Sequence, residues 1–131
     1  MRLLLDTHAW LWATTERDRL SAEAIALLED TENEALVSAA SAHEIAIKWS
    51  LGKLRLPEPP ASWVPAVVAR RGYGVLPIEL RHALRVSTLP KHHADPFDRV
   101  LIAQALEEDL PILTADPAIR RYEVRVIGAE R

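Results

Sequence analysis

The sequence predicts an α/β fold in which a parallel sheet lies between two layers of helices. Short apolar runs alternate along the chain with longer segments whose apolar residues recur at helical spacing. This alternation is typical of βαβ units, whose crossover helices cover both faces of a parallel sheet. Apolar runs such as residues 3–5 fit this arrangement, because strands buried on both faces carry few polar residues. A length of 131 residues suits a single domain over residues 1–131.

Five strands are expected, each a short apolar stretch bounded by polar or turn-forming residues. The first is "RLLLDT", an apolar run that ends at the acid Asp6. The second is "EALVSAAS", and the third, "GYGVLPI", lies between glycine and proline residues. The expected strands cover residues 2–7, 34–41, 72–78, 110–116 and 124–128.

Helices are expected between these strands. The segment "SAHEIAIKWSLGKL" has apolar residues at helical spacing and ends at Gly52, a residue that commonly terminates helices. Pro65 either interrupts or starts the helix in "ASWVPAVVARRG". The expected helical segments cover residues 8–15, 21–31, 41–54, 61–72, 79–89, 96–109 and 117–123.

Composition excludes several classes of protein. Hydrophobic residues make up 49% of the chain, which argues against disorder, and no apolar run approaches the about 20 residues of a membrane span. The chain has no cysteine and only a short apolar N-terminal run, so we expect a cytoplasmic protein without a signal peptide. A net charge of −3 argues against a protein that is basic overall, although 13 of its 16 cations are arginine. Arginine pairs are compatible with a solvated surface or with phosphate binding; they are Arg70 and Arg71, Arg81 and Arg85, and Arg120 and Arg121.

Acidic residues gather at the ends of the expected strands. In a parallel sheet, ligands bind outside the carboxyl ends of the strands, near the point where the strand order reverses. Asp6 follows the first strand, Glu44 begins the helix after the second, and Asp116 follows the fourth. Asp95 and Asp98 open the long helix of residues 96–109. We therefore expect these acids to share one edge of the sheet.

Each acid also has a local explanation as a helix cap. Ser41-x-x-Glu44 matches a capping box, while Asp95 and Asp116 each precede a proline, as N-cap residues often do. Asp98 is less well explained, because an acid in the first turn gains only a few tenths of a kcal/mol. Asp6 is the hardest to explain as a cap alone, since a carboxylate beside a buried strand is unfavourable without a partner.

Taken together, the acids predict a metal site. Four junctions with like charges on one edge would raise one another's pKa and destabilise the fold without a counter-ion. Hard cations such as Mg²⁺ or Mn²⁺ bind carboxylate oxygens and keep several water ligands, which suits hydrolysis of phosphodiesters. The pattern allows one ion or two. The chain lacks a glycine-rich phosphate loop, a G-x-S-x-G elbow and a cysteine nucleophile, so other catalytic sites are not indicated.

Four stretches in order carry a resemblance to a known family. They are "LLLDTHAWLW", "SAASAHEIAIKWSLGKL", "HHADPFDRVLIAQAL" and "ILTADPAI". Together they resemble PIN-domain ribonucleases, and more narrowly the VapC toxins of bacterial type II toxin–antitoxin systems. The resemblance runs over nearly the whole chain. It implies a three-layer α/β/α domain with a five-stranded parallel sheet.

The resemblance also implies roles for individual residues. The catalytic and metal-binding acids would be Asp6, Glu44, Asp98 and Asp116. Asp95 would be an additional ligand, an outer-sphere base or a helix cap. Thr7 and Thr114 would assist by hydrogen bonds, Arg99 would position the RNA backbone, and His93 could touch the substrate. The implied cofactor is Mg²⁺ or Mn²⁺, and the implied partners are RNA, a second copy of the chain in a homodimer, and a cognate antitoxin laid over the acidic site.

These observations favour a metal-dependent endoribonuclease over two rival functions. One rival is a non-catalytic module that uses the same fold to bind RNA or protein. Clustered negative charge argues against it, because carboxylates repel RNA. The other is a nuclease outside toxin–antitoxin systems, including one that cuts DNA; nothing except the resemblance separates DNA from RNA as the substrate.

Overall fold

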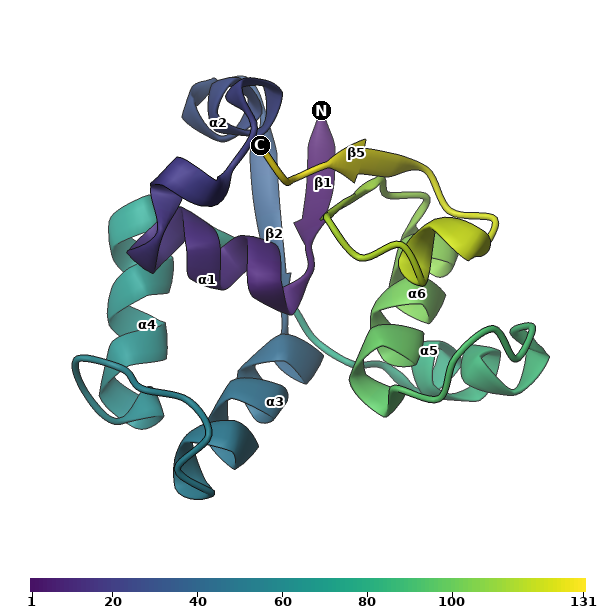
Figure 1. The fold of residues 1–131 in the computed structure, drawn as a ribbon. Coiled ribbons are helices and arrows are strands. Elements are labelled where there is room, and N and C mark those ends of the chain that lie inside the picture. Colours follow the sequence, from purple (N-terminus) through teal and green to yellow (C-terminus); the bar gives the residue numbers. More distant parts are fainter.

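A parallel five-stranded sheet in the order β3-β2-β1-β4-β5 organises the chain (Figure 1). The structure is a computed structural model that describes residues 1–131. The strands are β1 (Arg2–Leu5), β2 (Glu34–Ser38), β3 (Gly74–Leu76), β4 (Ile112–Thr114) and β5 (Val126–Gly128). The helices are α1 (Thr7–Thr15), α2 (Ala22–Glu29), α3 (Ala39–Ser50), α4 (Pro60–Arg71), α5 (Leu80–Arg85) and α6 (Pro96–Glu108). The predicted parallel α/β architecture is therefore confirmed.

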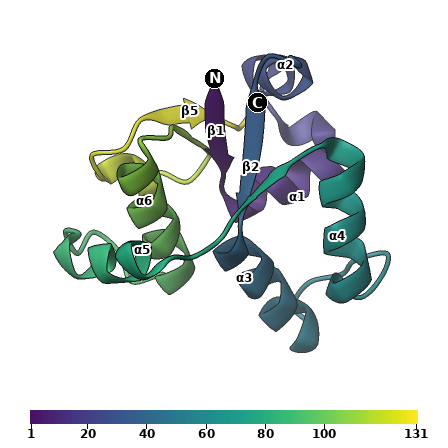
Figure 2. The same cartoon turned by 180° about the vertical axis from the view of Figure 1, so that it is seen from behind.

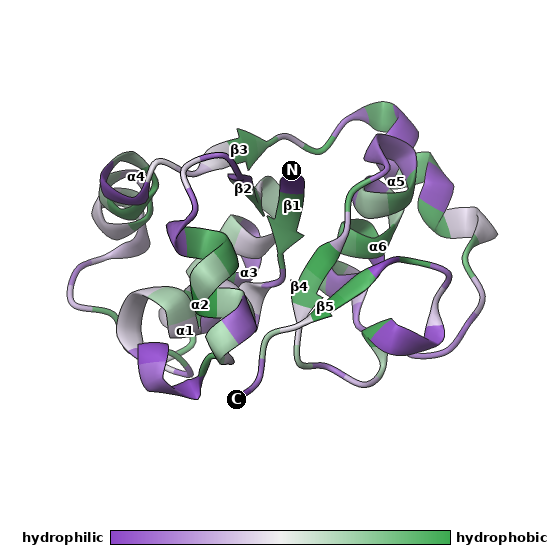
Figure 3. Ribbon diagram, turned by 90° about the horizontal axis from the view of Figure 1, so that it is seen from above, coloured by the Kyte–Doolittle hydropathy of each residue, from purple (hydrophilic) through white to green (hydrophobic).

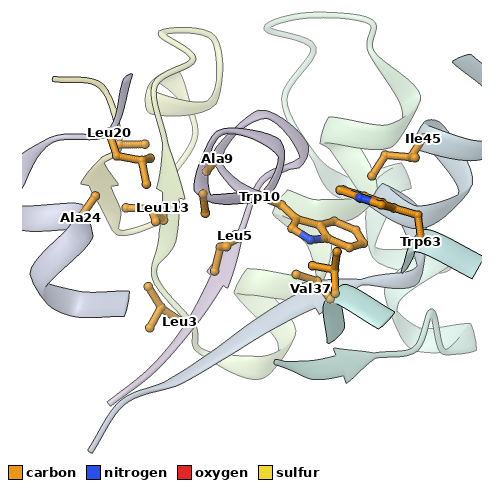
Figure 4. Close-up of a cluster of buried hydrophobic side chains, with 13 residues drawn as sticks. Leu3, Leu5, Ala9, Trp10, Leu20, Ala24, Val37, Ile45, Trp63 and Leu113 are labelled. Carbon is orange, nitrogen blue, oxygen red and sulfur yellow. The ribbon is translucent and has the colours of Figure 1, made fainter. Parts of the chain in front are cut away.

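The side chains of β1 divide the core into two layers because they alternate between the faces of the sheet. Leu3 and Leu5 pack into one hydrophobic cluster with residues of α1, α2, α3 and α4. Leu4 packs into the other, mainly with residues of α6. Figure 4 shows the first cluster, in which the rings of Trp10 and Trp63 stack with centroids 6.2 Å apart. Figure 3 shows helices on both sides of the strands.

The chain crosses between the layers at β3. Figure 2 shows it running from α4 through β3 to α5, which lies beside α6. Gln104 of α6 joins these parts at the centre of the molecule. Its side-chain carbonyl accepts a hydrogen bond from the Ser38 hydroxyl at 2.6 Å, and its amide donates to the backbone carbonyl of Pro77 at 3.1 Å. Because Gln104 is fully buried, these bonds fix α6 against the end of β2.

Several element boundaries differ from the prediction. Strand β2 ends at Ser38 and helix α3 begins at Ala39, whereas the sequence predicted strand up to residue 41. The Ser38 hydroxyl caps α3 by accepting from the N–H of Ala40 at 2.9 Å. The capping box predicted at Ser41 and Glu44 is therefore wrong: Glu44 lies in the second turn, too far from the helix start to cap it.

Other differences concern short helical segments. Pro65 lies inside α4, which begins earlier at Pro60, so Pro65 does not start the helix. The helix predicted over residues 79–89 divides into α5 and a 3₁₀ turn at Val86–Thr88. The turn predicted over residues 117–123 shortens to Ile119–Arg121. Gly52 follows α3 in a left-handed conformation, with φ of 71°, as expected of a residue that ends a helix. None of the helices is both long and apolar enough to cross a membrane.

Candidate active site

Asp6 lies where the strand order reverses. It follows β1, which pairs with β2 on one side and with β4 on the other. Its Oδ1 accepts from the backbone N–H of Ala9 at 2.7 Å and so caps α1, while its Oδ2 accepts from the Thr114 hydroxyl. Asp6 is 3% exposed, and these bonds supply the partners that a buried carboxylate needs.

Thr114, the last residue of β4, connects Asp6 to Asp116. Its hydroxyl donates to Asp6 and accepts from the backbone N–H of Asp116 at 3.0 Å. Asp116 Oδ1 accepts from the N–H of Ala118 at 2.8 Å, but the N-cap of the 3₁₀ turn at Ile119–Arg121 is Ala118, so the helix cap suggested by the proline after Asp116 is not formed. Asp116 Oδ2 has no hydrogen-bond partner within the protein. One oxygen of Asp116 is therefore free to act on a ligand.

The first turn of α6 separates the roles of Asp95 and Asp98. Asp95 Oδ1 accepts from the N–H of Phe97 at 2.9 Å and from that of Asp98 at 3.1 Å, so Asp95 is the N-cap of α6. The Asp98 carboxylate bonds to a side chain instead, with its Oδ2 lying 3.2 Å from Nε2 of His93. Asp98 therefore keeps its other oxygen free.

The pKa shifts show that the charges of four acids, Asp6, Asp95, Asp98 and Asp116, act on one another. Burial raises the pKa of Asp98 to about 7, and the charges of Asp95, Asp116 and Asp6 contribute to this rise, against the lowering effect of the His93 hydrogen bond. Burial likewise raises the pKa of Asp6, assisted by the charge of Asp116 and opposed by the hydrogen bonds from Thr114 and Ala9. The expected crowding of negative charge at this edge of the sheet is thus present between Asp6, Asp98 and Asp116.

Glu44 lies beside this group with a cation of its own. Its Oε1 accepts from the Thr7 hydroxyl at 2.8 Å, and its Oε2 lies 2.6 Å from Nζ of Lys48, one helical turn further along α3. Ser41 Oγ is 2.9 Å from the same Thr7 hydroxyl. Since Thr7 is adjacent to Asp6, these bonds bring Glu44 next to the aspartates. Its charge, however, is balanced by Lys48.

The donor atoms of this site suit a hard divalent cation. Carboxylate oxygens are the ligands that Mg²⁺ and Mn²⁺ prefer. The raised pKa values of Asp6 and Asp98 show that burial disfavours their charged forms, which a bound cation would stabilise. In the structure, no three Asp, Glu or His side chains form a ready-made ion site. Hydrogen bonds from Thr114, Thr7 and His93 engage oxygens of three of the four acids. The residues fit such a cation by chemistry and charge.

Two adjoining cavities lie next to the acids. One, of about 450 Å³, is lined by Asp6, Asp116 and Glu130 together with His8, Trp12 and Arg19. The last three also line a second cavity of about 270 Å³, which we call the basic cavity. Its cations are Arg19, Lys48, Lys53 and Arg55, with Glu16 as its one carboxylate.

The cations of the basic cavity were not singled out by the sequence patterns. Lys53 and Arg55 lie in the connection between α3 and α4, and only the folded chain brings them beside Arg19. One signal was present, since Lys48 follows Glu44 by four residues, the spacing of a helical ion pair. One of the arginine pairs seen in the sequence behaves differently: Arg81 and Arg85 bind the surface carboxylates of Glu79, Glu108 and Glu107.

Arg99 does not line these two cavities. Its guanidinium donates to the carbonyl of Pro90 at 2.8 Å and to the Tyr122 hydroxyl at 3.0 Å, with longer bonds to the carbonyls of Val86 and Leu89. Through these contacts Arg99 connects α6 to the loop that precedes it. Nη1 and Nη2 of Arg99 are thus used within the protein, and the expected contact of Arg99 with an RNA backbone stays a prediction.

A family profile described as the PIN domain matches residues 3–124. The chain belongs to the PIN domain family. Two curated relatives agree, both from Mycobacterium tuberculosis. Ribonuclease VapC22 is 30% identical over 122 residues, which are 92% of this chain and 91% of the relative. Ribonuclease VapC16 is 47% identical over 68 residues, which are 49% of this chain and only 48%, about half, of the relative.

Solved structures share the fold of this PIN domain. A VapBC2 complex from Rickettsia felis, bound to a DNA fragment from its promoter, aligns with a TM-score of 0.74 at 14% identity, over 99% of this chain and 100% of that one. A DNA-bound VapBC complex from Salmonella typhimurium aligns with a TM-score of 0.71 at 15% identity, over 97% of each chain. The predicted three-layer fold is confirmed by these similarities.

The crowded acids predict a pH dependence for the stability of this PIN domain. Because the folded pKa of Asp98 is about 7, far above the unfolded value near 3.9, the folded state retains a proton that the unfolded state loses. This contribution to stability is complete below about pH 4 and is lost as the pH rises through about 7. We expect Asp98→Asn to be more stable than the parent by about 1–2 kcal/mol at pH 8, after allowance for solvent screening, and nearly equal to it at pH 4.

Urea unfolding in EDTA at the two pH values measures this difference. Asp109→Asn is the matched control, because the Asp109 side chain is 94% exposed and should give no pH-dependent difference. Equal stability of Asp98→Asn and the parent at pH 8 would show that the surroundings of Asp98 do not destabilise its ionised form.

Proposed function

We propose that this PIN domain is a metal-dependent endoribonuclease and the toxin of a toxin–antitoxin pair. The observation that carries the proposal is the group of three interacting aspartates, Asp6, Asp98 and Asp116, at the strand-order reversal. Two curated relatives are named ribonucleases, and one of them aligns with nearly the whole chain. An RNA substrate would place the enzyme in the cytoplasm.

The acids would have distinct roles in this reaction. Asp6, Asp98 and Asp116 would hold Mg²⁺ or Mn²⁺, with Glu44 completing the cluster. Such an ion makes hydroxide available at neutral pH and neutralises negative charge on a phosphodiester. Thr114 holds Asp6 in orientation, and Thr7 does the same for Glu44. Asp95 serves as the N-cap that starts α6.

Between Glu44 and Asp116, Asp116 is the better placed to orient the attacking water. Both Glu44 oxygens are engaged, one by Thr7 and one by Lys48. Asp116 keeps Oδ2 without a protein partner, at the edge of a cavity that also contains Asp6. We therefore assign the orientation of the attacking water to Asp116.

The basic cavity would hold the RNA backbone beside the acids. Carboxylates repel a polyanion, so binding needs cations nearby, and phosphate contacts position nucleic acids without reading their sequence. Lys53 and Arg55 make no ion pair with a carboxylate of the protein and are available for phosphate oxygens. Arg19 lies at the junction of the two cavities, with its guanidinium carbon 4.3 Å from the centre of the Trp12 ring. An RNA strand bound in the basic cavity would thus continue into the cavity that contains Asp6 and Asp116.

Two protein partners belong to this proposal. The structural neighbours are VapBC toxin–antitoxin complexes, which supports a cognate antitoxin as partner. A homodimer is supported by apolar side chains exposed on one stretch of the chain, Ile78, Leu80 and Leu84. Sedimentation equilibrium of the isolated protein distinguishes dimer from monomer.

Cleavage of RNA tests the assignment of the acids. We expect Asp6→Asn and Asp98→Asn each to lower the cleavage rate about 100-fold or more, the scale expected for a group that stabilises transition-state charge. EDTA should abolish cleavage by the parent, and Mg²⁺ or Mn²⁺ should restore it. Asp109→Asn, on the exposed C-terminal side of α6, is the control that should cleave like the parent.

The same assay separates the rival functions. A variant at Asp6 or Asp98 that cleaves like the parent at equal folded concentration contradicts the site. Binding of RNA without cleavage at any metal concentration would favour a non-catalytic module. Cleavage of single-stranded DNA but not RNA would favour a nuclease of another kind.

Charge reversal tests the basic cavity. In an Asp98→Asn background that leaves RNA intact, the pair Lys53→Glu and Arg55→Glu should weaken RNA binding about 10-fold or more. The slope of log K against log salt should fall by about 0.7 for each phosphate that the altered side chains no longer neutralise. Fluorescence anisotropy with a labelled single-stranded RNA measures both quantities. The same reversal at Arg70 and Arg71, at the end of α4, is the matched control; equal weakening by both pairs would refute a localised RNA site.

A further inference from the structure

His93 joins the catalytic site to a hydrogen-bonded network behind it. Its Nε2 lies 3.2 Å from Oδ2 of Asp98, and its Nδ1 lies 2.8 Å from the hydroxyl of Tyr122. The Tyr122 hydroxyl in turn is 3.0 Å from Nη1 of Arg99. Tyr122 comes from the segment between Ile119–Arg121 and β5, so the network connects two distant parts of the chain.

The chemistry of Arg99 sets the direction of its bond to Tyr122. A guanidinium can only donate, so the Tyr122 oxygen accepts from Arg99. The Tyr122 proton is then available for Nδ1 of a neutral His93, which leaves the imidazole hydrogen on Nε2. That N–H donates to Asp98 Oδ2. The tautomer of His93 with its hydrogen on Nε2 thus satisfies both of its partners.

The network is anchored and largely buried. Arg99 is held by backbone carbonyls of the loop before α6, including that of Pro90 at 2.8 Å. Tyr122 is 5% exposed, and its ring packs edge-on against His93 with centroids 5.4 Å apart. The side chains of His93 and Asp98 are 17% and 15% exposed. Such packing restricts rotation of the imidazole and, through it, of the Asp98 carboxylate.

Both nitrogens of His93 are engaged, which argues against direct contact with a substrate or a cation. His93 is the one hydrogen-bond donor to the Asp98 carboxylate. The backbone N–H of Asp98 donates to Asp95 instead. His93 thus fixes Oδ2 of Asp98 and leaves Oδ1 without a protein partner. An outer partner that orients a metal ligand in this way commonly affects both affinity and activity.

We propose that His93 and Tyr122 are positioning residues that orient the Asp98 carboxylate for cation binding and catalysis. This inference rests on the proposed metal-dependent function. It replaces the expected contact of His93 with substrate by an action through Asp98. Arg99 belongs to the same network, because it donates a hydrogen bond to the Tyr122 hydroxyl.

The test measures Mn²⁺ affinity by calorimetry on RNA-free protein, together with kcat and KM for RNA cleavage. His93→Leu should lower Mn²⁺ affinity about 10- to 100-fold and lower kcat with little change in KM. Tyr122→Phe, which keeps the ring, should give a smaller loss in the same direction. His93→Gln should recover part of the loss, because its side-chain amide supplies an N–H near the position of Nε2.

His92→Ala is the matched control. The His92 ring also packs against Tyr122, with centroids 4.8 Å apart, but it makes no hydrogen bond to an acid. A role in folding alone would make His93→Gln no better than His93→Leu at equal folded concentration. The inference is overturned if His93→Leu and Tyr122→Phe bind Mn²⁺ and cleave RNA within about twofold of the parent. Failure of the parent itself to bind Mn²⁺ would instead overturn the proposed metal-dependent function.

Discussion

The site depends on one constraint: three aspartate side chains, which carry like charges, lie close together at a partly buried edge of the sheet. Burial raises the pKa of both Asp98 and Asp6; the charges of Asp95, Asp116 and Asp6 add to the rise at Asp98, and the charge of Asp116 adds to that at Asp6. The surrounding structure offsets part of this repulsion. Thr114 donates to Asp6, His93 is bonded to Asp98, and the positive N-terminal ends of α1 and α6 lie beside the acids. The remaining negative charge would give the site its affinity for a cation.

The topology of the sheet produces this confinement. Strand β1 is central, with β2 and β3 added on one side and β4 and β5 on the other, so the order of the strands reverses beside Asp6. Thr114 is the last residue of the neighbouring strand β4, and its hydroxyl donates a hydrogen bond to Asp6. Gln104 then ties α6, which carries Asp98, to the end of β2. Asp6 and Asp98 are therefore positioned by the strand order together with these buried side-chain hydrogen bonds.

Much of this arrangement follows from local sequence patterns. Apolar runs predicted all five strands, and the acids after them predicted the site, because parallel strands bring their carboxyl ends to one edge. Contacts between distant residues were not predictable. His93 and Tyr122 are 29 positions apart and belong to no shared motif, and the cations Lys53 and Arg55 meet Arg19 only through packing. The start of α3 at Ala39 was missed because alanine and serine there fit both strand and helix.

Direct location of a bound ion tests the central claim. Crystals soaked in Mn²⁺ should show an anomalous-scattering peak in contact with the carboxylates of Asp6, Asp98 and Asp116. The same peak should be absent or much weaker in crystals of Asp98→Asn. A peak that contacts none of these residues, or none at all at millimolar Mn²⁺ in the parent, would contradict the account of this edge as a cation-binding catalytic site.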